Sequence, residues 1–284
     1  MGFPAVSWKL RELVLRLLRP LFRLGLQSAP VVVGKLRPLA GHGSEGVLGG
    51  GNSEDVPPPE LWENYADDPA QYLADGRVDM DSVMALLAKH GIAQPRVAMD
   101  LGCAAGRMVR HFPRGEGAEV WGADIGGPYI AWCQRNLPGI NFVTVSTAPH
   151  LPFADGYFDF VFCASVFTHI TDLADAWLLE IRRILKPGGH VYLTVHDKVS
   201  YRQLLAKNAQ TGLGTFLERV HDFERRHRVA NADCDMFFFG SDPASQVFYD
   251  REFITRKWSR WMELVAYEGQ FHNYQSAMLL RKAD

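Results

Sequence analysis

Residues 96–107 read RVAMDLGCAAGR, and this stretch decides the fold. Its apolar run closes on Asp100, and a glycine-containing turn follows at once. Residues 117–124, GAEVWGAD, repeat the pattern, because a second short apolar run closes on Asp124. Pro128 then suits the first turn of a helix. The pattern predicts two strands that each end in a carboxylate, with a glycine turn after the first and a helix after the second.

The chain on either side continues to alternate between strand and helix patterns. Asp81 is predicted to cap a helix that Gly91 ends, and Asp172 to cap one that stops at Lys186-Pro187-Gly188-Gly189. Further strands are predicted at 140–145, 158–165 and 190–195. Strands that alternate with helices indicate right-handed βαβ units and a parallel sheet. We therefore expect an α/β domain with a doubly wound, Rossmann-like sheet.

Ligands of such sheets bind beyond the carboxyl ends of the strands. Asp100, Asp124, Ser165 and His196 all fall at those ends. A dinucleotide fingerprint places glycine at 102, 104 and 107, but Ala104 and Arg107 stand at two of these positions. A phosphate loop of the Gly-Lys-Ser/Thr type does not follow either. The sequence therefore disfavours NAD and ATP as ligands.

Residues 96–196 resemble the class I S-adenosylmethionine-dependent methyltransferases through motifs in a fixed order. VAMDLGCAAGR resembles the family's first motif, and Asp124 matches the acidic residue that binds the ribose hydroxyls. LPFADGYFDFVFCAS (151–165) resembles the approach to the fourth strand, and LKPGGHVYLTV (185–195) the turn into the fifth. The resemblance implies a seven-stranded sheet completed by an antiparallel hairpin at 261–269 and 273–282, with S-adenosylmethionine as cofactor.

The resemblance also implies a set of cofactor-binding residues, with two departures from the family. Ala104 stands where a glycine is common, and Thr147 stands where an acidic residue often faces the adenine. The Thr147 side chain and the Ala148 backbone are expected to serve instead. The full predicted set is Asp100, Gly102, Ala104, Gly106, Asp124, Ile125, Thr147, Ala148 and Ser165.

A long insertion, about 197–260, follows the predicted fifth strand and is placed to cover an acceptor. Its aromatic residues, among them Phe237-Phe238-Phe239, line a pocket or form the insertion's own core, and both interpretations stay open. A hydroxyl acceptor benefits from a general base with a pKa near 7. The candidates are His169 and His196; His196 is preferred because Asp197 and the insertion follow it directly.

Charge is unevenly placed along the 284 residues, whose formal net charge is −2. Residues 1–40 carry seven cationic side chains and one acidic one. Within them, 8–24 predict a basic amphipathic helix that lies in a membrane interface, docks on a protein surface or belongs to an organelle transit peptide. Residues 41–60 are rich in Gly, Ser and Pro and predict a flexible linker. The methyltransferase-like domain then covers 61–284.

Composition narrows the function further. The four cysteines form no paired spacing, which favours reduced thiols, a cytoplasmic location and no metal site. The net charge and the sequence Cys163-Ala-Ser-Val, in place of an amino-methylation motif after the fourth strand, argue against a nucleic-acid substrate. We expect a methyltransferase acting on a hydroxyl oxygen of a small molecule or glycan, with peripheral membrane association. The alternatives are a non-catalytic scaffold that works through its basic arm and, less favoured, a dinucleotide-dependent oxidoreductase.

Overall fold

A computed structural model describes residues 56–284 apart from 64, 209–212 and 241–244. The predicted basic arm, 1–40, and most of the predicted linker, 41–60, lie outside the described residues, so these domain boundaries stay predictions. The chain divides into two units, Met1–Val47 and Leu48–Asp284, and the description below concerns the second. Among the described residues, no helix has the length and apolar character needed to cross a membrane.

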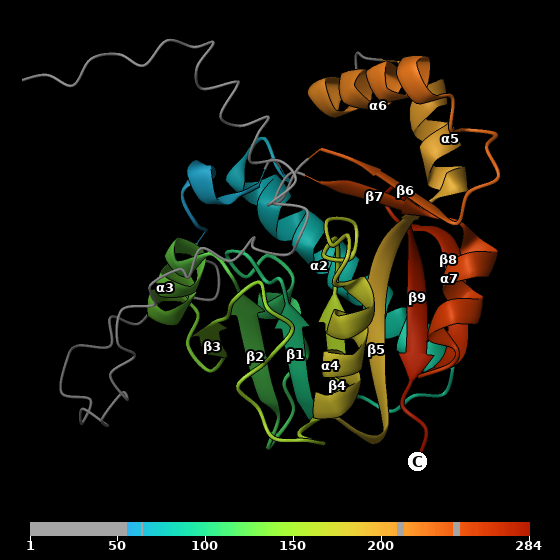
Figure 1. Ribbon diagram of the computed structural model, residues 1–284. Helices are drawn as coiled ribbons and strands as arrows, with labels where there is room; N and C mark the ends of the chain where they lie inside the picture. The colour runs from blue at the N-terminus through green and yellow to red at the C-terminus, as the bar shows by residue number, and fades with distance from the viewer. Residues whose placement is uncertain (1–55, 64, 209–212, 241–244) are drawn as a thin grey trace, which may run out of the picture. The chain divides into compact units, whose positions relative to one another are not determined.

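The central sheet has the predicted doubly wound topology (Figure 1). Its parallel strands lie in the order β3 (Asn141–Thr144), β2 (Glu119–Asp124), β1 (Val97–Leu101), β4 (Phe158–Cys163) and β5 (Leu185–Asp197). The strand β9 (Gln275–Arg281) pairs antiparallel with β5, and β8 (Glu263–His272) pairs antiparallel with β9. The fold class and the antiparallel terminal hairpin are therefore confirmed. The predicted number of seven strands is wrong, because two strands of the insertion join the sheet and the described residues form nine strands.

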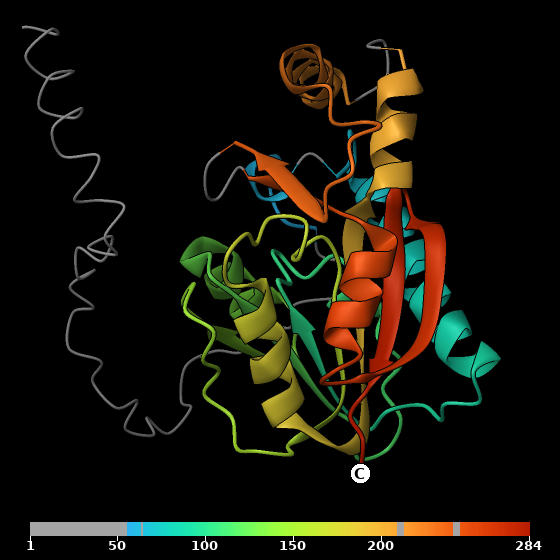
Figure 2. The same cartoon turned by 45° about the vertical axis from the view of Figure 1, so that its right-hand side comes forward.

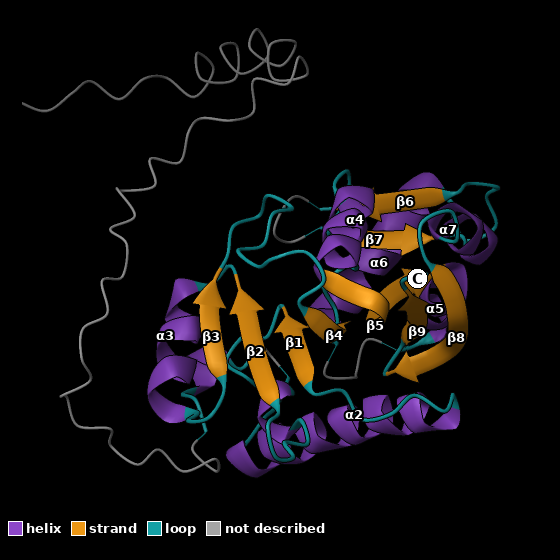
Figure 3. Cartoon of the chain, turned by 90° about the horizontal axis from the view of Figure 1, so that it is seen from below, coloured by secondary structure: helices purple, strands orange, loops and turns teal. Residues whose placement is uncertain are grey.

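Helices cover both faces of this sheet (Figures 2 and 3). One face packs against α2 (Pro69–Lys89) and α3 (Gly127–Asn136), whose buried side chains include Met80, Leu87 and Ile130. The other face packs against α4 (Ala174–Ile184) and α7 (Arg251–Trp258), which contribute Trp177, Ile181 and Trp258 among others. Two 3-10 helices, η1 (Pro59–Leu61) and η2 (Val109–His111), complete the elements around the first strands.

Two predicted helix caps are wrong. The helix α2 begins at Pro69, where the side chain of Asp68 accepts a hydrogen bond of 2.9 Å from the Gln71 amide, so Asp81 lies inside the helix. Asp68 followed by Pro69 combines a capping carboxylate with a residue suited to the first turn, which makes it the stronger start signal. Likewise, α4 begins at Ala174 with Leu173 at its N-cap, so Asp172 does not cap it.

The insertion forms a small layer of its own beyond the carboxyl end of β5 (Figure 1). It contains α5 (Lys198–Ala206), α6 (Gly214–His227) and a hairpin of β6 (Met236–Phe239) and β7 (Gln246–Tyr249). The strand β7 continues the sheet by pairing in parallel with the last two residues of β5.

The aromatic residues of the insertion form its own core. Phe237 and Phe239 pack with Tyr201, Leu217 and Phe248, whereas Phe238 points outward and is 47% exposed. Burial of these side chains stabilises the layer against the sheet, at roughly 2 kcal/mol for each fully buried aromatic side chain. Of the two interpretations of these aromatic residues, the structure favours the core of the insertion.

Candidate active site

The glycine loop after β1 is tied to the end of β2. The amides of Gly102 and Cys103 both donate to the carbonyl of Ala123, at 2.7 and 3.1 Å. Gly102 has a φ of +80°, and a Cβ placed there would lie 2.4 Å from a methyl group of Val166. Only glycine therefore fits at this position, and the tight turn brings backbone to the carboxyl edge of the sheet.

Asp124 holds the other side of this loop. Its Oδ2 accepts a hydrogen bond of 2.8 Å from the Ala104 amide, and its Oδ1 accepts one of 2.7 Å from the Gly126 amide. Burial raises the pKa of Asp124, and the hydrogen bonds from Gly126 and Ala104 oppose that rise. The backbone of Ile125 also donates to this carboxylate. Because each carboxylate oxygen has two lone pairs, some acceptor capacity remains after these contacts.

A second carboxylate lies close to the first. Asp100, at the end of β1, is 3% exposed and accepts a hydrogen bond from the backbone of Val109. Burial and then the neighbouring charge of Asp124 raise its pKa well above the usual range, and the guanidinium of Arg107 partly offsets this. Two crowded carboxylates favour a ligand that brings positive charge or hydroxyl donors to this edge of the sheet.

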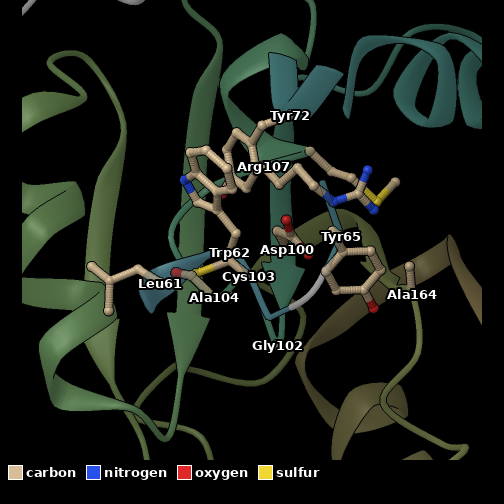
Figure 4. Close-up of a pocket in the computed structure, with 11 residues that line it drawn as sticks. Leu61, Trp62, Tyr65, Tyr72, Asp100, Gly102, Cys103, Ala104, Arg107 and Ala164 are labelled. Carbon is tan, nitrogen blue, oxygen red and sulfur yellow. The ribbon is translucent and has the colours of Figure 1, made fainter. Parts of the chain in front are cut away.

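Beside the loop lies a cavity of about 40 Å³ (Figure 4). Of the predicted cofactor-binding residues, Asp100, Gly102 and Ala104 line it. The volume has room for a few water molecules. A larger ligand therefore requires side chains of the lining to move. The residues of this lining that sequence reasoning missed are Leu61, Trp62, Tyr65, Tyr72, Cys103, Arg107, Met108 and Ala164.

Arg107 is a buried cation in the lining of the cavity that the sequence analysis did not assign to the site. Its guanidinium pairs with the Asp79 carboxylate at 2.6 Å and lies 4.4 Å from the centre of the Tyr65 ring. It is 7% exposed. In the sequence, Arg107 served only to argue against a dinucleotide. The position of Arg107 directly after the glycine loop was the sequence signal from which a buried ion pair could have been predicted.

Ser165 is held at the end of β4 by a polar network. Its φ is +59°, its amide donates to Thr194 Oγ1 at 2.7 Å, and Gln275 Nε2 donates to its hydroxyl at 2.8 Å. Thr194 also donates to Gln275 Oε1, at 2.5 Å. These contacts fix a backbone conformation that costs energy for a residue other than glycine. The backbone of Ser165 is therefore held rigidly, and its hydroxyl is already hydrogen-bonded.

The other predicted cofactor-binding residues, Asp124 and Ser165 included, do not line the cavity. Gly106 packs inward, since a Cβ there would lie 2.5 Å from Leu137. Ile125 is 53% exposed directly after Asp124. Thr147 and Ala148 are exposed after β3, and the Ala148 amide donates to Ser146 Oγ at 3.3 Å. Their predicted contacts with adenine stay predictions.

His196 is enclosed by the insertion. It is 1% exposed, its ring stacks on Phe248 at 4.8 Å between centroids, and neither ring nitrogen has a hydrogen-bond partner among the described residues. Burial, and then the charge of His169, lower the pKa of His196 to about 3. A base with this pKa, shut off from the site, accepts protons poorly at neutral pH. We therefore prefer His169 over His196 as the candidate general base.

His169 has the geometry of an oriented imidazole. Its Nδ1 lies 2.7 Å from the carbonyl oxygen of Ser245. A carbonyl oxygen only accepts hydrogen bonds, so Nδ1 carries the proton and Nε2 keeps its lone pair. The ring is half-buried in the loop after β4, four residues beyond Ser165. Among the described residues, no group of three His, Cys, Asp or Glu side chains has the geometry to bind a metal ion.

Known proteins match the part of the chain that carries this site. Residues 99–193 match the family described as a methyltransferase domain. A malonyl-[acyl-carrier protein] O-methyltransferase of Pseudescherichia vulneris is 32% identical over 43% of this chain and 48% of the relative. The ubiquinone/menaquinone biosynthesis C-methyltransferase UbiE of Burkholderia cenocepacia (strain HI2424) is 34% identical over 36% of this chain and 43% of the relative. The chain spans about half the length, or less, of these curated relatives.

Solved structures share the fold. A protein of Pyrococcus horikoshii OT3 has a TM-score of 0.52 at 17% identity, over 79% of this chain and 95% of the other. The magnesium protoporphyrin IX methyltransferase ChlM of Synechocystis PCC 6803 has a TM-score of 0.51 at 17% identity, over 79% of this chain and 94% of the other. At such identities the likeness concerns the fold alone. This shared fold agrees with the match of residues 99–193 to the family described as a methyltransferase domain.

Proposed function

We propose that this protein transfers the methyl group of S-adenosylmethionine to a hydroxyl oxygen of a small-molecule or glycan acceptor. The observation that carries the proposal is the carboxylate of Asp124 at the end of β2. It is fixed by two loop amides, is 9% exposed and keeps lone pairs for a ribose diol. A hydroxyl that donates to a carboxylate makes a charge-assisted hydrogen bond, which is stronger than a neutral one.

The surroundings of Asp124 suit this donor. S-adenosylmethionine supplies a methyl group on a positively charged sulfur that leaves as a neutral thioether. The neighbouring carboxyl groups of Asp100 and Asp124 favour a cationic ligand at this edge of the sheet, because a positive charge stabilises their ionised forms. The ligand has no phosphate, and the loop has neither the glycine at 104 nor the Gly-Lys-Ser/Thr sequence of a phosphate-binding loop.

His169 is the proposed general base. As the bond from the acceptor oxygen to the methyl carbon forms and the carbon–sulfur bond breaks, the hydroxyl proton must leave. Nε2 of His169 accepts it, because Nδ1–H is held by the Ser245 carbonyl. One matched relative is an O-methyltransferase and another a C-methyltransferase. We favour oxygen as the acceptor atom because a hydroxyl gains most from such a base.

Transfer of labelled methyl from S-adenosylmethionine to a panel of hydroxyl-bearing small molecules and sugars tests this proposal. His169→Gln is expected to lower kcat by about 10²- to 10⁴-fold with little change in donor affinity. His196→Phe keeps the packing of the insertion and is expected to retain most of the activity. Full activity in His169→Gln would contradict the role of His169, and a product methylated on carbon or nitrogen would contradict the choice of oxygen.

We also propose that the basic arm, which lies outside the described residues, holds the protein at the cytoplasmic face of an anionic membrane. Its arginines and lysines suit anionic headgroups, and its leucines suit acyl chains. The full chain is expected to co-sediment with vesicles containing phosphatidylglycerol, and a chain lacking residues 1–40 is expected to stay in the supernatant. Equal sedimentation of both chains would refute this placement.

A further inference from the structure

A second hollow lies between the insertion and the terminal hairpin, apart from the cavity at the glycine loop. It is a groove of about 400 Å³. One wall is the C-terminal end of α5, and the other is the end of β8 together with the turn that joins β8 to β9. We call it the α5 groove, and it is lined by Gln203, Ala206, Lys207, Gln270, Asn273 and Tyr274.

One buried carboxylate holds both walls of the α5 groove in place. Asp197 Oδ1 accepts a hydrogen bond of 2.7 Å from the Ser200 amide and so caps α5. Asp197 Oδ2 accepts from Tyr267 on β8 at 2.8 Å and from Ser276 on β9 at 2.7 Å. Asp197 is 2% exposed. The groove is therefore shaped before any ligand arrives, and a preformed site loses less entropy when a ligand binds.

The end of β8 and the β8–β9 turn each carry one strained residue at the groove. Gln270 and Asn273 both have a φ of +55°, which is the left-handed region. A residue other than glycine or asparagine pays roughly 1 kcal/mol for this conformation. Gln270 nevertheless occupies one of the two positions. Such strain often marks a site where side chains must be presented in a set direction, and here it presents two amides at the groove.

Tyr274 forms an aromatic wall that is supported from behind. Its ring lies 5.3 Å from the ring of His196 and 5.8 Å from that of Phe216, measured between centroids. The ammonium of Lys207 lies 5.9 Å from its centre. Neither ring nitrogen of His196 has a hydrogen-bond partner among the described residues. The ring of Tyr274 therefore packs against an imidazole whose nitrogens make no hydrogen bond there.

The α5 groove and the cavity at the glycine loop are linked through a polar network. Ala164 lines that cavity and Tyr274 lines the groove, and their chain neighbours Ser165 and Gln275 are joined by a hydrogen bond of 2.8 Å. Tyr65 of the cavity is also near enough to raise the pKa of Tyr274, second to the effect of burial. These contacts are our reason for assigning the groove to the acceptor of the proposed reaction.

We propose that the α5 groove binds the acceptor and that this acceptor is a sugar carrying an anionic group. Three amide side chains each offer both donors and acceptors, which suits a ligand with many hydroxyls. The ring of Tyr274 suits the apolar face of a sugar. The lining holds one cation and no carboxylate, so Lys207 is placed to pair with the anionic group. This inference rests on the proposed function and adds the class of substrate.

Three probes test the assignment: D-glucuronate, D-glucose 6-phosphate and methyl α-D-glucopyranoside, each titrated by saturation-transfer NMR into protein saturated with S-adenosylhomocysteine. At least one anionic probe is expected to bind about fivefold more tightly than the neutral one, the size of effect that one exposed ion pair gives. The two anionic probes distinguish a carboxylate from a phosphate as the preferred group.

The variant Lys207→Gln is expected to remove the preference for the anionic probes, and Gln203→Ala to weaken all three probes. Both variants are expected to keep the affinity for S-adenosylhomocysteine. Lys257→Gln is the matched control, because this lysine lies on α7 and pairs with Asp175 away from the groove. It is expected to behave as the wild type.

Two results overturn the proposal in distinguishable ways. If S-adenosylhomocysteine binds but no probe does, or if Lys207→Gln keeps the anionic preference, the acceptor class is wrong and the proposed function stands. If S-adenosylhomocysteine does not bind, the proposed function itself fails. Sugar binding without donor binding would make the groove a sugar site but would refute its role as an acceptor site.

Discussion

The carboxylate of Asp124 has a structural role as well as the proposed one. It fixes the amide of Ala104, whose φ of +43° is unusual for a residue with a side chain. The loop therefore keeps its shape through this carboxylate, although the family often has a glycine at that position. This explains why alanine is tolerated there, and it means that a substitution of Asp124 affects both the loop and any ribose.

The ribose assignment is tested by a pair of ligands as well as by substitution. Asp124→Ala is expected to weaken binding of S-adenosylhomocysteine by about a hundredfold, because two hydrogen bonds to a charged group are lost. The same substitution is expected to cost much less with the 2′-deoxyribose analogue, which has one hydroxyl fewer. Isothermal titration calorimetry measures all four affinities.

Asp75→Ala serves as the control for this measurement, since Asp75 is an exposed carboxylate on α2. It is expected to leave both affinities unchanged. An equal loss for the two ligands in Asp124→Ala would mean that Asp124 acts only by shaping the loop. The ribose contact would then be wrong.

At the scale of elements, the insertion depends on burying a neutral imidazole. His196 packs among the rings of Phe216, Phe248 and Tyr274, at the point where β5 leads into α5. Because its pKa falls to about 3 in the folded protein and is about 6.5 in the unfolded chain, the unfolded chain binds the extra proton between these values. The folded state therefore loses stability as the pH falls below about 6.5.

His196→Phe is expected to remove this sensitivity to acid. Between pH 7.5 and pH 5, the free energy of unfolding of the wild type is expected to fall by about 2 kcal/mol more than that of the variant. Urea denaturation at the two pH values measures the difference. Other histidines contribute equally to both proteins, so parallel losses in wild type and variant would show that His196 is not buried as described.

The helices and strands differ in how well the sequence predicted them. The strands of the sheet were predicted because their apolar runs are short and end in turn residues. The start of α2 was predicted at the wrong residue. Asp81 also precedes an apolar run, so it was chosen as the N-cap in place of Asp68. The hairpin of β6 and β7 was not predicted, since an FFF run has no alternation that separates a strand from a packed loop.

For the molecule as a whole, the site combines segments that are near in the sequence with segments that are far apart. The loop residues Asp100 and Gly102 were predicted because one motif contains them. Trp62 and Tyr65 precede that motif by more than thirty residues, and Gln275 follows it by more than a hundred and fifty. No local pattern marks these residues, because only the tertiary fold brings them to the same edge of the sheet.

Titration of the full chain with S-adenosylhomocysteine, with NADH as the control ligand, tests whether the site binds the methyl donor. We expect a dissociation constant in the micromolar range for S-adenosylhomocysteine and no measurable heat for NADH, because the site offers the Asp124 carboxylate to a ribose and has no phosphate-binding loop. Binding of NADH alone, or of neither ligand, would show that this is not a site for S-adenosylmethionine.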